Sequence, residues 1–193
     1  ALATMQRQLL QLVRLTDDLL DVARISRDRL ELRRERIDLR TVVQSAVEAA
    51  RPQLEAAGHW LTVRVPPASV WVDADLTRLS QALSNILLNA VKYRERGGRI
   101  GIAASVVDDQ TALVSVTDTG VGIPPELLAR LFVMFTQLDH TLDRARGGLG
   151  IGLALARRLV EMHGGTIEAL RDGTGRGRTF NGRLPIASHG SRG

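Results

Sequence analysis

Glycine-rich segments are the feature that most constrains what this chain can fold into. Two of them, residues 118–124 and 147–153, flank a short aromatic run at residues 132–135. A third element lies upstream at residues 85–93, where two asparagines recur four positions apart. Glycine removes the side chain wherever a turn or a close approach needs the space. In this order, the segments predict one binding site assembled from pieces of a single domain.

Composition excludes several classes of protein. The 193 residues contain no cysteine, which excludes disulfides and thiolate metal sites and favours a cytoplasmic location, whether or not a longer parent is membrane-anchored. Hydrophobic residues make up 44% and aromatic residues 3%, so the core is expected to be aliphatic. The net charge of +5 comes from scattered arginines, and few aromatics could stack on bases, so no nucleic-acid partner is expected.

The first 30 residues predict one long helix. Leu12, Leu15, Leu19 and Val22 recur at spacings of three and four, the seam of a helical bundle. Such a stripe needs a partner helix, from a longer parent protein or from a second copy of the chain. The alternative is that it folds back on the domain that follows. Residues 1–37 are therefore expected to be part of a bundle domain with a connector, in which the charged run at residues 31–38 leads into the next domain.

Residues 38–186 predict an α+β domain with a mixed sheet of about five strands and three helices on one face. Asp75 is expected to cap the second of these helices. Residues 187–193 form a polar tail that is expected to be disordered. The expected elements are helices at 39–57, 75–93 and 149–163, and strands at 61–65, 70–72, 99–107, 112–117, 166–170 and 178–184.

Asn85 and Asn89 project from one face of the second helix, and Lys92 extends that face by one turn. Neutral amide oxygens can coordinate Mg²⁺ without cancelling its charge. A lysine at the next turn supplies a point charge for phosphate. The plainer alternative is that both amides cap a neighbouring loop.

Asp118 ends a strand and is followed by Gly120 and Gly122. The glycines allow a flat ligand to lie against the backbone, and the carboxylate can accept a hydrogen bond from an amino group such as that of adenine. An ordinary turn with an aspartate hydrogen bond is the alternative. Pro124 is expected to begin a short helix.

Gly148, Gly150 and Gly152 lead into the third helix, whose free amides and dipole favour a triphosphate. The segment matches neither a Walker loop nor the dinucleotide fingerprint. A hinge role for these glycines is compatible with phosphate binding. Residues 136–146 are polar and charged and are expected to form a mobile lid, from which Arg144 or Arg146 could reach a γ-phosphate.

Together, these motifs resemble the catalytic, ATP-binding domain of the sensor histidine kinases of two-component systems. Residues 85–93 resemble the family's N box, residues 118–124 the G1 box, residues 132–135 the F box, residues 147–152 the G2 box and residues 175–180 the last glycine box. The resemblance implies a Bergerat-type ATP-binding two-layer sandwich, preceded by the second helix of a dimerisation and phosphotransfer bundle.

The resemblance also implies roles for individual residues. Asp118 would bind adenine, Asn85 and Asn89 would hold Mg²⁺, and Lys92 would contact phosphate, with Arg144 and Arg146 as further catalytic candidates. The other residues expected to contact ATP are Tyr93, Gly120, Gly122, Ile123, Phe135, Gly148, Leu149, Gly150, Ile151, Gly152, Leu153 and Thr179.

The function implied is transfer of the ATP γ-phosphoryl group to a histidine on the first bundle helix, which this chain lacks. None of His59, His140, His163 and His189 stands in the family's acceptor motif. The expected partners are that acceptor histidine, a response-regulator receiver domain and a second copy of the parent through the bundle. Val133 and Arg94 depart from the family pattern.

Two other functions stay open at this point. One is a nucleotide-binding or docking module without kinase activity. The other is an ATPase related to gyrase and Hsp90, which would need a catalytic carboxylate four residues before the metal-binding asparagine, where this chain has Asn85.

Overall fold

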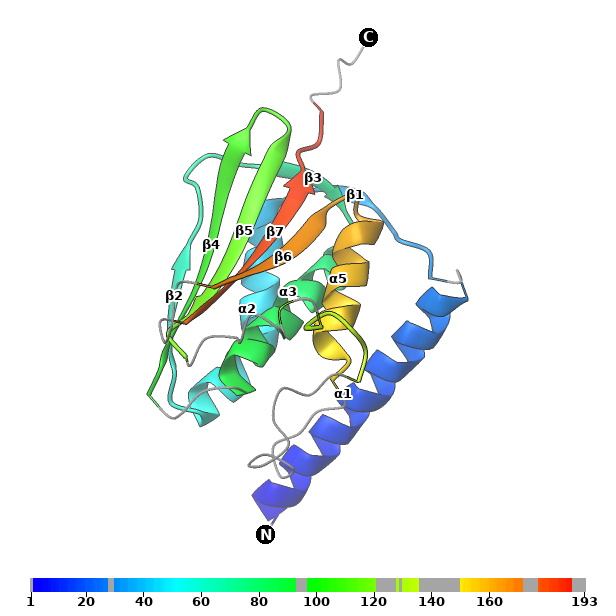
Figure 1. The fold of residues 1–193 in the computed structure, drawn as a ribbon, viewed down its shortest axis with the longest axis vertical. Helices are drawn as coiled ribbons and strands as arrows, with labels where there is room; N and C mark the ends of the chain where they lie inside the picture. Colours follow the sequence, from blue (N-terminus) through cyan, green and yellow to red (C-terminus); the bar gives the residue numbers. More distant parts are fainter. Residues whose placement is uncertain are drawn as a thin grey trace.

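A two-layer α+β domain carries a long N-terminal helix at its side (Figure 1). The computed structural model describes residues 2–27, 30–92, 97–120, 128, 130–135, 150–171 and 177–188. Its main sheet has five strands in the order β2-β4-β5-β7-β6, with β2 and β4 parallel and the other neighbours antiparallel. The expected mixed sheet is therefore confirmed. The strands are β2 (Trp60–Arg64), β4 (Arg99–Asp108), β5 (Thr111–Asp118), β6 (Thr166–Arg171) and β7 (Arg178–Pro185).

Three helices, α2 (Leu39–Ala56), α3 (Leu76–Lys92) and α5 (Gly152–Met162), cover one face of this sheet (Figure 1). Alternate residues of the central strands, such as Ile100 and Ile102 on β4, are buried against them. The core is mostly aliphatic, as the composition predicts. The open second face of the sheet is consistent with an antiparallel arrangement that faces water on one side.

Helix α3 begins where the sequence predicts. The backbone amide of Arg78 donates to Asp75 Oδ1 at 3.1 Å, which confirms Asp75 as its N-cap. Helix α5 starts at Gly152, three residues later than expected. At its other end, His163 is buried between two backbone groups, since its Nδ1 bonds Leu159 O at 2.7 Å and its Nε2 accepts from the Asp75 amide at 3.1 Å.

The connector expected at residues 31–38 is partly a strand, which is a correction. β1 (Glu35–Asp38) pairs antiparallel with β3 (Trp71–Ala74), and these two strands form a separate small sheet. The sequence pattern did not predict this strand because β1 has no alternation of apolar and polar residues. Its formation depends on backbone pairing with a segment more than thirty residues away. β3 therefore does not belong to the main sheet.

Helix α1 (Leu2–Ser26) is a few residues shorter than expected and runs alongside α5 (Figure 1). Its C-terminal half contacts the domain through buried Ile25 and an ion pair between Asp21 and Arg78. Leu9 and Leu12, further toward the N-terminus, are each 61% exposed. The helix thus folds back on the domain in part and leaves much of its apolar stripe uncovered.

The end of the last strand returns to the small sheet. The amide of Ala187, where the polar tail was expected to begin, donates to Trp71 O at 2.7 Å. Residues 189–193 of that tail lie outside the described residues. Among the helices of the described part, none is long and apolar enough to cross a membrane.

Candidate functional site

The asparagine face of α3 meets the start of α5. The apolar side of α3 packs in the core through Leu83, Ile86 and Leu87. Asn85 and Asn89 therefore lie half-buried on an adjacent side of the helix. Asn85 Nδ2 donates to Gly152 O at 3.2 Å. A Cβ atom on Gly152 would lie 3.9 Å from Asn85 Cγ, so the two elements are in van der Waals contact here.

Asn89 carries an unsatisfied polar atom. Its Nδ2 is buried and has no hydrogen-bond partner among the described residues. A buried amide without a partner costs about 1–3 kcal/mol, so such a group in a folded protein calls for an explanation. Lys92, the last residue of α3, lies three positions further along the same side of the helix.

These residues fit a magnesium ion of the kind that binds with a nucleotide. Mg²⁺ is bound by one or two protein oxygens and completes its octahedron with water and phosphate oxygens. The described residues contain no group of three or more His, Cys, Asp or Glu side chains that could form an all-protein cage. Mg²⁺ would be held by the side-chain oxygens of Asn85 and Asn89, and two such oxygens are a donor set of the required small size.

Asp118 lies at the end of β5, with its side chain almost completely buried. Its Oδ1 accepts from the Gly120 amide at 2.8 Å, which is the aspartate turn given above as the alternative to a ligand-binding role. Its Oδ2 accepts from Arg178 Nε at 2.9 Å. Sequence reasoning missed Arg178. The available signal was a charged residue two positions before Phe180 in an alternating strand, where the side chain must point inward.

The last glycine segment packs directly against this turn. Gly177 has φ +85° and its amide donates to Gly120 O at 2.9 Å. A Cβ atom on Gly177 would lie 2.0 Å from Asp118 O, so only glycine fits. The backbone around Asp118 is therefore held from two sides, by its own turn and by the start of β7.

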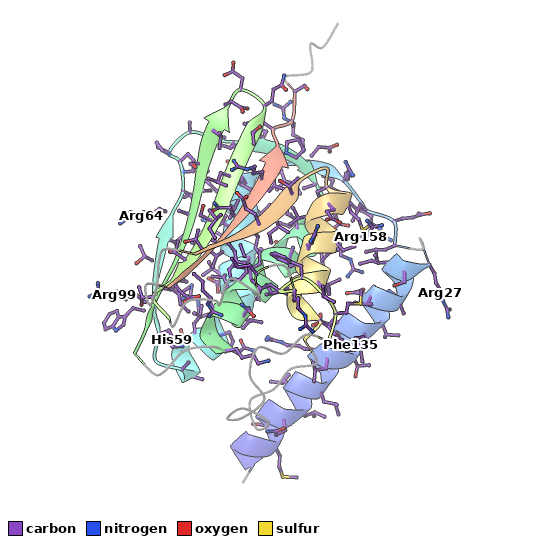
Figure 2. The ribbon with its side chains drawn as sticks, in the orientation of Figure 1. Arg27, His59, Arg64, Arg99, Phe135 and Arg158 are labelled. Carbon is purple, nitrogen blue, oxygen red and sulfur yellow. The ribbon has the colours of Figure 1, made fainter. Side chains whose placement is uncertain are left out.

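The aromatic run has a half-buried end and an exposed end. Phe132 packs edge-on against Phe180 with ring centroids 6.3 Å apart, and the Arg157 guanidinium lies 5.6 Å from the Phe132 ring centre. Phe135 is 64% exposed and adopts φ +63°, a conformation that is rare for a bulky residue (Figure 2). Its amide donates to Gly150 O at 3.1 Å, which joins the aromatic run to the glycine segment before α5.

The N-terminus of α5 has no side-chain cap from its own N-cap residue, Ile151. The first amides of a helix lack intrahelical partners, and together with the helix dipole they favour an anion. The side chains of Ile151 and Leu153 are buried in the core and anchor this helix start.

A comparison with known families identifies the domain type. Residues 74–188 match the model described as histidine kinase-, DNA gyrase B-, and HSP90-like ATPase. The chain belongs to this ATPase family. The match begins at the end of β3 and extends past β7, so it includes α3, β5 and α5, the elements that carry the candidate site.

Individual relatives within this ATPase family confirm the resemblance to sensor histidine kinases. The histidine protein kinase DivJ of Caulobacter vibrioides is 39% identical over 91% of this chain and 29% of its own length. Full-length ShkA in complex with AMPPNP superposes with a TM-score of 0.77 at 32% identity, over 92% of this chain and 36% of ShkA. The mycobacterial sensor histidine kinase MprB gives a TM-score of 0.69 at 27% identity, over 79% of this chain and 98% of MprB. The chain spans less than a third of the length of DivJ.

The ATPase site predicted from sequence is only partly described. The structure brings Asn85 together with Gly152, and Asp118 with Gly120. Thr179 lies beside Arg178 on β7 and pairs with Thr117 of β5. The roles of all these residues in ATP binding stay predictions. The remaining predicted residues lie outside the described part of the chain: Tyr93, Gly122, Ile123, Arg144, Arg146, Gly148 and Leu149, together with the expected lid at 136–146 and the helix at Pro124.

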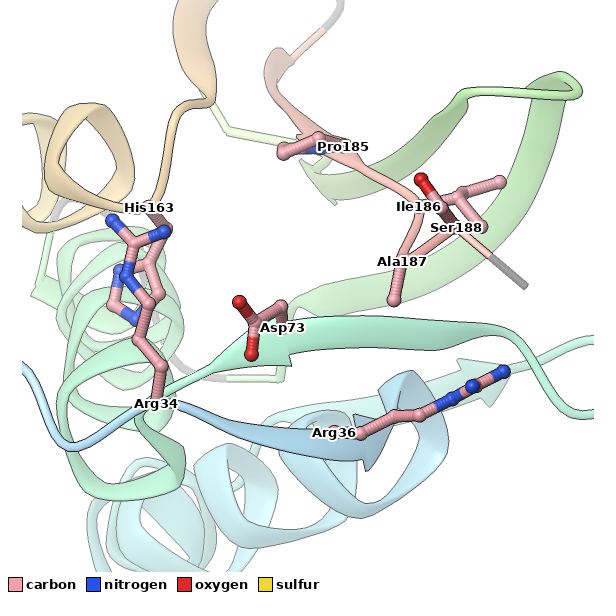
Figure 3. A pocket seen from close by; sticks show the side chains of 8 residues that line it. All are labelled: Arg34, Arg36, Asp73, His163, Pro185, Ile186, Ala187 and Ser188. Atoms are coloured by element: carbon pink, nitrogen blue, oxygen red, sulfur yellow. The ribbon is translucent and has the colours of Figure 1, made fainter. Parts of the chain in front are cut away.

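A hollow of about 450 Å³ lies at the other end of β7 from Asp118. It is lined by Arg34, Arg36 and Asp73 near the small sheet, by His163, and by the residues from Pro185, the last of β7, to Ser188 (Figure 3). Arg34 donates to Met162 O and so closes the end of α5. None of the predicted ATP-contacting residues lines this hollow, so it is separate from the candidate site.

Proposed function

We propose that this chain is the phosphoryl-donor domain of a sensor histidine kinase. It binds ATP with Mg²⁺ and presents the γ-phosphoryl group to a histidine on a bundle helix outside the chain. The observation that supports this proposal is the Asn85–Gly152 contact, because it holds the asparagine face of α3 against the first residue of α5, a helix whose N-cap residue makes no side-chain capping hydrogen bond. A cation site and an anion site in contact match the chemistry of a magnesium-bound triphosphate.

Each side chain then has a defined task. Asp118 accepts a hydrogen bond from the adenine 6-amino group, and the first amides of α5 bind phosphate oxygens. The oxygens of Asn85 and Asn89 hold Mg²⁺, which when bound neutralises charge on the phosphates. Lys92 contributes a second positive charge from the end of α3.

Transfer itself requires positioning more than covalent chemistry from the protein. The bond between the γ-phosphorus and the β–γ bridging oxygen breaks, and a bond to an imidazole nitrogen of the acceptor histidine forms. The imidazole proton leaves to a base that lies with the acceptor, outside this chain. Arg144 and Arg146 are the candidates to stabilise the charge on the transferring group.

The partners follow from the exposed stripe on α1. Leu9, Leu12 and Leu19 are uncovered, and a helix of this pattern is stabilised by packing in a bundle. We propose that it pairs with the first bundle helix and with the second copy of the parent kinase. The phosphorylated histidine then donates its phosphoryl group to the receiver domain of a response regulator.

The test is a calorimetric titration of ADP and AMPPNP, with and without Mg²⁺, on the wild type and on Asp118→Asn. We expect micromolar to submillimolar binding by the wild type, and a loss of about tenfold or more in the variant, because a hydrogen bond to a charged group contributes about 1.5–3 kcal/mol. Asp108→Asn, at the far end of β4, is the matched control and should bind normally.

A positive titration leads to the activity itself. The wild type should then phosphorylate a separately supplied bundle domain that carries the acceptor histidine. A folded wild-type chain that binds neither nucleotide would refute the proposal and favour a docking module. Nucleotide hydrolysis without transfer to the supplied histidine would favour an ATPase.

A further inference from the structure

Arg178 is the only arginine that is buried within the described residues, where it is 3% exposed. It opens β7 on the side of the sheet that faces the helices, directly opposite Asp118 in the strand register. The side chains of both residues are 3% exposed or less, and Arg178 Nε donates to Asp118 Oδ2 at 2.9 Å. A buried ion pair is weak evidence for stability, so its placement asks for another explanation.

We infer that Arg178 is a positioning residue that fixes the carboxylate of Asp118 for reading the 6-amino group of adenine. This inference rests on the proposed function. Both carboxylate oxygens are held, Oδ1 by the Gly120 amide and Oδ2 by Arg178, so the carboxylate cannot rotate about its bond to Cβ. An ionised carboxylate has about four lone-pair sites, so two held oxygens can still accept from a ligand.

The consequence concerns the choice between purine bases. Adenine offers an amino group at position 6, whereas hypoxanthine offers an oxygen that a fixed carboxylate repels. A site built around one hydrogen bond discriminates strongly because the wrong ligand leaves its buried groups unpaired. If Asp118 could turn away, the penalty for hypoxanthine would fall and the gain from adenine would be lost. Arg178 therefore raises the ratio of the affinity for adenine nucleotides to the affinity for hypoxanthine nucleotides.

The backbone of the same turn supports this role. Gly177, one residue before Arg178, donates to Gly120 O and leaves no room for a Cβ atom beside Asp118 O. The arginine and the carboxylate thus approach each other on backbones that are already in contact. The pair is built into the turn that forms one wall of the candidate base site.

The experiment compares ADP with IDP, which lacks the 6-amino group, in the presence of Mg²⁺. The proteins are the wild type, Arg178→Gln, Arg178→Lys and Arg183→Gln. Arg183 is the matched control, because it lies on the same strand and also pairs with a carboxylate, Glu168 at 3.2 Å, but is exposed. We expect the wild type to prefer ADP by about tenfold or more, and Arg178→Gln to lose about tenfold in ADP affinity with unchanged or tighter binding of IDP.

The lysine variant separates charge from geometry. A lysine keeps the positive charge but cannot reproduce the planar guanidinium contact, so it should stay folded and still lose the preference for ADP. Arg183→Gln should leave both affinities unchanged. An ADP-to-IDP ratio that stays at the wild-type value in folded Arg178→Lys or Arg178→Gln would overturn the inference, as would equal losses for both nucleotides. A wild type that binds neither nucleotide refutes the proposed function instead, whereas one that binds both equally refutes only this inference.

Discussion

The contact between α1 and α3 gives the sharpest prediction about how the bundle helix is held. Asp21 Oδ2 accepts from Arg78 Nη1 at 2.7 Å and from Gln81 Nε2 at 2.9 Å. The Asp21 side chain is 8% exposed and that of Arg78 is 21% exposed. Asp21→Asn removes the charge of the acceptor but keeps its size. Hydrogen bonds between charged groups contribute about 1.5–3 kcal/mol, so we expect this end of α1 to dock about 2 kcal/mol less tightly.

Native-state hydrogen exchange measures this change directly. Because α1 contacts the domain mainly through its C-terminal half, it should open without unfolding the sheet. A loss of about 2 kcal/mol corresponds to roughly 30-fold faster exchange. We expect this acceleration for the α1 amides between Asp21 and Ile25, with the amides of β5 unchanged.

Asp17→Asn is the matched control, since Asp17 is an exposed aspartate on the same helix. It should leave the exchange of α1 within about twofold of the wild type, as surface changes away from contacts usually do. If Asp21→Asn exchanges as slowly as Asp17→Asn, the ion pair does not hold the helix and the reasoning is refuted.

Three further predictions concern stability. Gly177→Ala should lower the free energy of unfolding in urea titrations by more than about 3 kcal/mol, or prevent folding, because its Cβ would lie 2.0 Å from Asp118 O. Gly97→Ala is the control, since Gly97 also has a positive φ but lies in open space, and it should cost only about 1 kcal/mol. Burial raises the pKa of the Asp18 carboxyl from 3.8 to about 6, so the folded state binds its proton more tightly than the unfolded state does. Stability is therefore lost as the pH rises from 3.8 through about 6. Asp18→Asn should abolish this loss and raise the melting temperature at pH 7. Burial lowers the pKa of His163 below 6.5, so its contribution to stability is present above pH 6.5 and lost as the pH falls. His163→Gln should make the melting temperature less dependent on pH over this range in a pH series of thermal melts.

Much of the candidate site could be predicted because its chemistry depends on local spacing. Two amides four residues apart on an apolar helix must share a side of that helix, and the structure has Asn85 and Asn89 so arranged on α3. A carboxylate followed by Gly-x-Gly at a strand end forms the turn seen at Asp118. These features need no knowledge of distant parts of the chain.

The features that sequence reasoning missed depend on long-range register. β1 forms through backbone pairing with β3, so its charged residues leave no periodic trace. Arg178 meets Asp118 only because β5 and β7 pair in one register. Likewise, the apolar stripe of α1 predicts a bundle face, whereas the ion pair between Asp21 and Arg78 that holds the helix to the domain leaves no trace in that pattern.

The end of α3 has a practical consequence for chemistry on this protein. Lys92 is the only lysine among the 193 residues, and it lies one turn beyond Asn89. Every other cationic side chain, histidine apart, is an arginine, which amine-directed reagents leave untouched. The N-terminus aside, the chain therefore carries a single reactive amine. Acylation or reductive methylation would install one reporter group, located where the phosphates are proposed to bind.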